Sequence, residues 1–128
     1  MAKAKVVINE QHKLLPDQER ALKEAGFEEI KFLKIPKDGL TKEEQLELAE
    51  DLEKEGGCIV FASPVPVLMA KVAFWTGYGA ASDNVPLKGC FLRVFVLHND
   101  KREKKELPNG TIVSVVAKEG WEVVPIRN

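Results

Sequence analysis

Cysteine, histidine and tyrosine are scarce in this chain of 128 residues, which contains only two, two and one of them, respectively. Without a cluster of cysteine and histidine, a structural zinc site is not expected. Cys58 and Cys90 each stand at the start of an apolar run, so we interpret both as buried strand thiols and not as a disulfide. No apolar run is long enough to cross a bilayer, and the N-terminus lacks the apolar segment of a secretory signal. We therefore expect a reduced, cytoplasmic environment and no membrane partner.

The sequence motifs of several enzyme classes are also missing. There is no G-x-G-x-x-G after a strand, no G-x-x-x-x-G-K-[ST] loop, no G-x-S-x-G elbow and no H-E-x-x-H. A paired-aspartate motif for magnesium is absent as well. Dinucleotide oxidoreductases, P-loop nucleotidases, serine hydrolases and zinc proteases are therefore disfavoured, and we expect neither a metal nor another cofactor.

An excess of charge of either sign is missing too. The chain has 19 Lys and Arg against 20 Asp and Glu, which gives a net charge of −1. Proteins that hold duplex nucleic acid need an unbalanced basic face, so we expect no duplex nucleic acid as a partner. A local anionic ligand stays compatible with this balance, because one pocket needs only a few cations or amides. The apolar fraction of 45% and the length indicate a single globular domain over residues 1–128.

Strand and helix patterns alternate along the chain. A helix is predicted from Pro16 to Gly26, and a capping box of Thr41 and Glu44 opens a second helix. A third, nearly uncharged helix is predicted over residues 65–75. Apolar or alternating runs predict strands at 5–8, 29–35, 58–62, 90–97, 111–117 and 121–126, with a further short strand ending at Leu107. The pattern predicts an α/β fold: a Rossmann-like three-layer sandwich with a mostly parallel sheet (β-α-β-α-β-α-β) and a C-terminal antiparallel β-hairpin.

Polar side chains follow three of the predicted parallel strands. Because the carboxyl ends of parallel strands share one edge of a sheet, these residues are expected to converge on a ligand site. The candidates are Asn9, Gln11 and His12 after the first strand, Ser63 after the third, and Asn99, Lys101 and Arg102 after the fourth.

Each candidate also has an ordinary structural interpretation. His12 is either an acid–base or phosphate-donating group or a surface histidine. Ser63 either holds an anion or caps the helix that follows it. Lys101 and Arg102 suit a phosphate group, whereas the charges of residues 103–106 are typical of a solvated hairpin, which we expect to shape and cover the site.

Three short motifs resemble the small CRISPR-associated proteins of the CARF (Rossmann-like) type. The run from His12 to Gln18 resembles the opening after the first strand in that family, and the Lys101–Glu103 run resembles its basic strand tip. The Ser63-Pro64 loop before an apolar helix is similar as well. The resemblance implies a homodimer that binds cyclic oligoadenylate, and in some relatives cleaves it without metal by attack of a ribose 2′-hydroxyl. It implies His12 as acid–base or phosphate donor, Ser63 as phosphate ligand, and Lys101 and Arg102 as charge stabilisers.

The sequence is also compatible with three other hypotheses. The chain could bind the ring tightly without turnover, as a sensor or sponge. It could be a non-catalytic protein-interaction module that uses the apolar helix 65–75, in which case no pocket lies at the strand tips. It could also be a small-molecule enzyme with His12 or His98 as its base.

Overall fold

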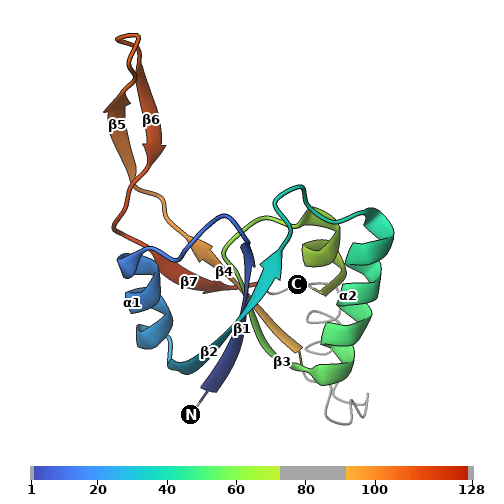
Figure 1. Ribbon diagram of the computed structural model, residues 1–128. Coiled ribbons are helices and arrows are strands. Elements are labelled where there is room, and N and C mark those ends of the chain that lie inside the picture. Colours follow the sequence, from blue (N-terminus) through green and yellow to red (C-terminus); the bar gives the residue numbers. More distant parts are fainter. Residues whose placement is uncertain (1, 73–91, 127–128) are drawn as a thin grey trace.

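Residues 2–72 and 92–126 are described by the structure, a computed structural model (Figure 1). The first half contains strands β1 (Ala2–Asn9), β2 (Phe27–Ile35) and β3 (Gly57–Phe61), and helices α1 (Pro16–Glu24) and α2 (Lys42–Glu55). Residues 66–72 are also helical. The second half contains β4 (Leu92–His98), β5 (Arg102–Glu106), β6 (Ile112–Val116) and β7 (Glu122–Pro125). Cys90 and residues 73–75 of the predicted third helix lie outside the described residues.

The main sheet has five strands in the order β2-β1-β3-β4-β7. The neighbours β2-β1, β1-β3 and β3-β4 are parallel, and only the last neighbour, β7, runs antiparallel to β4. The prediction of an α/β chain with a mostly parallel sheet is confirmed, as is the strand near the C-terminus. In this order β1 lies between β2 and β3. The chain therefore passes from β1 to the strand on one edge of β1, and later forms β3 along the opposite edge of β1.

Helices cover both faces of the sheet (Figure 1). On one face, α2 and the helical residues 66–72 pack on β1, β3 and β4 around a core of buried residues: Val7, Ile35, Ala49, Leu52, Ile59, Phe61, Val65, Leu68, Val72, Leu92 and Val94. On the other face, Leu22 of α1 packs with a smaller group: Ala4, Val6, Ile8, Phe27 and Val60. Central strands buried on both sides explain why residues 58–62 form an uninterrupted apolar run.

Asp17 joins the first turn of α1 to the segment that leads into β7. Its Oδ2 accepts hydrogen bonds from the backbone N–H of Gly120, at 2.8 Å, and of Trp121, at 2.9 Å. The Arg20 guanidinium donates to both carboxylate oxygens and also to the Trp121 carbonyl oxygen. The hydrogen bond from Arg20, followed by that from Trp121, holds the pKa of Asp17 well below its usual range. The charged form of Asp17 therefore holds this end of the sheet against α1.

The predicted C-terminal hairpin is present but separate from the main sheet. β5 and β6 form their own two-stranded antiparallel sheet, in which Arg102 pairs with Val116 and Glu106 with Ile112. The hairpin projects away from the body of the molecule (Figure 1). The expectation that it covers the strand tips is therefore wrong, because it rises past them instead of folding over them.

Candidate functional site

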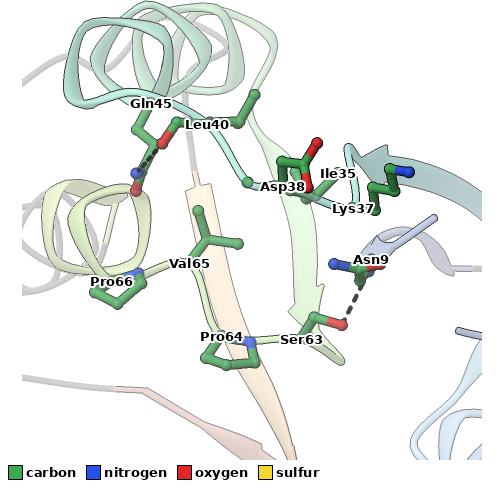
Figure 2. Close-up of a pocket in the computed structure, with 11 residues that line it drawn as sticks. Asn9, Ile35, Lys37, Asp38, Leu40, Gln45, Ser63, Pro64, Val65 and Pro66 are labelled. Atoms are coloured by element: carbon green, nitrogen blue, oxygen red, sulfur yellow. Dashed lines mark hydrogen bonds between the residues drawn. The ribbon is translucent and has the colours of Figure 1, made fainter. Parts of the chain in front are cut away.

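The tips of β1 and β3 are joined to each other by hydrogen bonds. The Ser63 hydroxyl accepts a hydrogen bond from the backbone N–H of Asn9 at 2.9 Å (Figure 2). The backbone N–H groups of Ala62 and Ser63 both donate to the Val7 carbonyl oxygen, at 2.9 and 3.2 Å. Open α/β sheets bind ligands at the point where the strand order reverses, which here is the junction of β1 and β3.

A hollow of about 290 Å³ opens at this junction, and we call it the strand-tip hollow. Its polar side chains come from four places: Asn9 at the end of β1, Lys37 and Asp38 after β2, Ser63 after β3, and Gln45 of α2 (Figure 2). Ile35, Leu40 and Val65 form its apolar wall. One cation, one carboxylate, two amides and one hydroxyl therefore surround a space suited to a small polar ligand.

Glu10 positions the loop that carries Lys37 and Asp38. The Glu10 carboxylate accepts a hydrogen bond from the backbone N–H of Lys37 at 2.9 Å, and the Glu10 N–H donates to the Ile35 carbonyl oxygen at 2.7 Å. The loop then turns through a hydrogen bond from the Gly39 N–H to the Pro36 carbonyl oxygen at 2.8 Å. The side chains of Lys37 and Asp38 are exposed, so both charged groups stay hydrated at the rim of the hollow.

Gln45 of α2 fixes the opposite wall of the hollow. This side chain is buried, and its Nε2 donates to the Leu40 carbonyl oxygen at 3.0 Å. Its Oε1 accepts from the Leu68 N–H at 3.1 Å, which satisfies a donor in the first turn of the helix over residues 66–72. The sequence offered Ser63 as a cap for this helix, but the side chain that bonds to a backbone N–H of its first turn is Gln45. The Ser63 hydroxyl bonds to β1 instead.

The three candidates after β1 lie on two sides of the strand tip. Asn9 lines the strand-tip hollow, and its Oδ1 accepts from the Gln11 N–H at 2.9 Å, which leaves Gln11 exposed on a tight turn. The exposed side chain of His12 lines a different hollow of about 300 Å³, between Phe32 of β2 and the α1 region. The structure therefore does not bring His12 to Ser63.

The three candidates after β4 lie at the root of the hairpin. Asn99 is only 4% exposed, and its Nδ2 donates to the carbonyl oxygens of Ala117 at 2.9 Å and Glu119 at 2.8 Å. Its Oδ1 accepts from the Lys101 N–H at 3.0 Å, and Arg102 Nη1 donates to the Asn99 carbonyl oxygen at 2.9 Å. Asn99 therefore ties both strands of the hairpin together. Neither it nor the exposed Lys101 and Arg102 belongs to the lining of the strand-tip hollow.

Lys37, Asp38 and Gln45 were missed by the sequence reasoning. The signal for Lys37 and Asp38 was present, because they follow the second predicted strand and every parallel strand ends at the same edge of the sheet. Gln45 gave no such signal, because its partner Leu68 lies far along the chain.

Comparisons with protein-family profiles, with curated proteins and with solved structures found no match. Within residues 2–72 and 92–126, no three His, Cys, Asp or Glu side chains are grouped so that they could hold a metal ion. No helix in the same part of the chain is both long and apolar enough to cross a bilayer.

Proposed function

We propose that this protein binds a nucleotide in the strand-tip hollow, and that the nucleotide is a cyclic oligoadenylate bound by a CARF-like, Rossmann-like homodimer. The observation that carries the proposal is the direct hydrogen bond between Asn9 and Ser63 at the reversal of the strand order. It holds a polar hollow at the place where sheets of this kind bind nucleotides. The helices on both faces and the parallel strands support the Rossmann-like assignment.

The charges at the rim favour a phosphodiester over a polyphosphate. Lys37 supplies one ammonium group for a phosphate, while Asp38 beside it repels a ligand that carries several negative charges. The same carboxylate accepts hydrogen bonds from ribose hydroxyls or from an adenine amino group. An oligoadenylate ring has a single charge on each phosphate together with such donors, so it suits this pair of side chains.

The size of the hollow suits one nucleotide unit. Its volume of about 290 Å³ is near the lower end of ligand pockets, which range from about 300 to 1,000 Å³. A complete ring would extend beyond it, so a ring would be shared between two copies of the chain. This agrees with the homodimer that the sequence resemblance implies.

The hollow supports binding more directly than it supports cleavage. Attack by a ribose 2′-hydroxyl needs an acid–base group and a cation at the reacting phosphate. His12 lines the hollow beside α1, and Lys101 and Arg102 lie at the hairpin root. We therefore propose a binding protein whose affinity depends on Lys37 and not on His12.

The interaction-module alternative receives less support from the apolar helix. Val65, Leu68 and Val72 are buried in the core beneath α2, and Met69 packs against the same core. Within residues 65–72, these larger apolar side chains therefore pack inside the molecule, and the exposed apolar positions are the small residues Pro66 and Ala70.

Calorimetric titration of the full chain with cyclic tetra-adenylate and cyclic hexa-adenylate, in EDTA, tests the proposal. We expect at least one of the two ring compounds to bind. Lys37→Gln should raise its dissociation constant about tenfold, which corresponds to a loss of roughly 1.4 kcal/mol of binding free energy. Lys13→Gln and His12→Ala, which alter the hollow beside α1, should keep the wild-type affinity. Separation of the products by chromatography reports turnover in the same samples. If the wild-type protein binds neither ring, the proposal is wrong.

A further inference from the structure

The β5–β6 hairpin exposes apolar side chains to solvent. Ile112 is 64% exposed and Val116 is 44% exposed, and they are two of the three large apolar residues that the described part of the chain leaves exposed. Both lie on one face of β6, since side chains alternate along a strand. A two-stranded hairpin that stands alone in water is marginally stable at best. A contact that covers β6 would therefore stabilise the hairpin.

The two edges of the hairpin have opposite character. All five residues of β5 are charged, in the sequence Arg-Glu-Lys-Lys-Glu. Strand edges with such charges resist pairing with another chain. β6 has the sequence Ile-Val-Ser-Val-Val, which is rich in β-branched residues and carries no charge. β6 is thus the edge suited to accept a further strand.

The hydrogen bonds at the two ends of the hairpin show which groups of β6 point outward. The Leu107 N–H donates to the Thr111 carbonyl oxygen at 2.7 Å, and the Ala117 N–H donates to the Lys101 carbonyl oxygen at 3.0 Å. Since bonded and non-bonded pairs alternate in an antiparallel ladder, Val113 and Val115 direct their backbone groups toward β5. Ile112, Ser114 and Val116 direct theirs away from β5, toward the outer edge.

We propose that this outer edge pairs with the same edge of a second copy of the chain. The two β6 strands run antiparallel about a two-fold axis at Ser114, so that Ile112 pairs with Val116 of the second copy and Val113 with Val115. The residues whose backbone groups point outward then bond to one another. Every apolar residue of β6 meets an apolar residue, and Ser114 meets Ser114. The exposed Ile112 and Val116 side chains cover each other.

The uncharged β6 sequence matches itself in this register, which makes a second copy the best occupant. In the resulting four-stranded sheet, the row that contains Val116 and Ile112 has Arg102 at one end and Glu106 of the second copy at the other. The row that contains Val115 and Val113 has Glu103 at one end and Lys105 of the second copy at the other. The two charges of a row are three strand spacings apart, about 14 Å, so they oppose the pairing no more than they favour it. The pairing uses neither Lys37 nor Ser63, so it is independent of the proposed ligand.

Sedimentation velocity with a matched pair of proline variants tests the proposal. Two five-residue strands bury less area than the roughly 1,200–2,000 Å² of a standard interface, so we expect a dimer that dissociates at micromolar dilution. Ser114→Pro removes an outward N–H at the β6 edge, and we expect at least a tenfold weaker dimer. Lys104→Pro removes the equivalent outward N–H at the β5 edge, because Lys104 pairs with Ser114, and should leave the dimer intact.

Disulfide trapping tests the same register without a proline. In a chain whose two native cysteines are replaced by serine, Ser114→Cys places one thiol from each copy at the axis. We expect it to form a covalent dimer under mild oxidation, whereas Lys104→Cys should form no covalent dimer. The proposal is overturned by a wild-type protein that is monomeric at all concentrations, by cross-linking of Lys104→Cys instead, or by a dimer that Ser114→Cys fails to trap.

Discussion

The backbone N–H of Asn9 donates a hydrogen bond to the Ser63 hydroxyl across the junction of β1 and β3. This bond is partly buried, so Ser63→Ala leaves the Asn9 N–H without its partner. We expect the variant to lose about 1–3 kcal/mol of unfolding free energy, the usual effect of an unsatisfied buried donor. Chemical denaturation measures the loss, and Gln11→Ala, at an exposed neighbouring position, should remain within about 0.5 kcal/mol of wild type.

Asp38 should act as a selectivity residue at the strand-tip hollow. Asp38→Asn removes the negative charge beside Lys37 and keeps a hydrogen-bonding side chain of the same shape. We expect ATP, which carries several charges, to bind this variant about threefold to tenfold more tightly than it binds the wild type, since a unit charge at about 4 Å contributes roughly 1 kcal/mol in water. Titration with ATP in EDTA measures the change. Equal ATP affinity for the two proteins would show that Asp38 does not face the phosphates.

Asp17 should make stability depend on pH. Its pKa is lowered in the folded state by Arg20 and by the Trp121 N–H, so ionised Asp17 stabilises the fold at pH values above its ordinary pKa of about 3.9. This contribution is lost as the pH falls from about 5 through the lower pKa of the folded state. We expect the thermal midpoint of Asp17→Asn to be lower at neutral pH and to fall less steeply with acid. Asp51→Asn, exposed on α2, should follow the wild-type curve.

Gly120 should be the least replaceable glycine of the hairpin region. It has a φ of +98°, and an added Cβ would lie 2.9 Å from Asn99 Oδ1, which cannot move without breaking the hairpin root. Gly110, at the hairpin tip, has a φ of +85° with nothing within 4 Å of an added Cβ. Gly110→Ala should therefore lose about 1–2 kcal/mol for the left-handed backbone alone.

Gly120→Ala should lose at least about 1 kcal/mol more than Gly110→Ala, because it also disturbs the hydrogen bonds of Asn99. Hydrogen exchange at Lys101 and Ala117 should be faster in Gly120→Ala than in Gly110→Ala. Equal exchange in the two variants would contradict this account of the hairpin root.

The sequence predicted the local elements well because their signals are local. The Thr41–Glu44 capping box forms as expected: Glu44 N–H donates to Thr41 Oγ1 at 3.1 Å, and Thr41 N–H donates to Glu44 Oε1 at 2.9 Å. The apolar run over residues 58–62 corresponds to β3 at Gly57–Phe61. Such patterns depend on residues three or four positions apart, so one segment contains all the information that is needed.

The candidate site was predicted only in part because its contacts are distant along the chain. The strand-tip rule brings Asn9 and Ser63 together, and the structure agrees. It would also place Asn99 there, but the Asn99 amide bonds to the carbonyl oxygens of Ala117 and Glu119 at the hairpin root. No local pattern indicates these partners. A polar strand tip can serve a ligand or a neighbouring loop, and the choice depends on the chain that follows.

The unbroken row of charges along β5 also limits how far the chain could assemble. Pairing through β6 about a two-fold axis uses both uncharged edges and leaves a charged β5 at each outer border of the shared sheet. Pairing through β6 is then closed at two copies, since an isologous contact presents no new copy of the surface that formed it. A hairpin whose two edge strands were both uncharged and apolar, as β6 is, could pair with further copies at each edge and form fibres. In this protein, β5 is the feature that would separate a dimer from a filament.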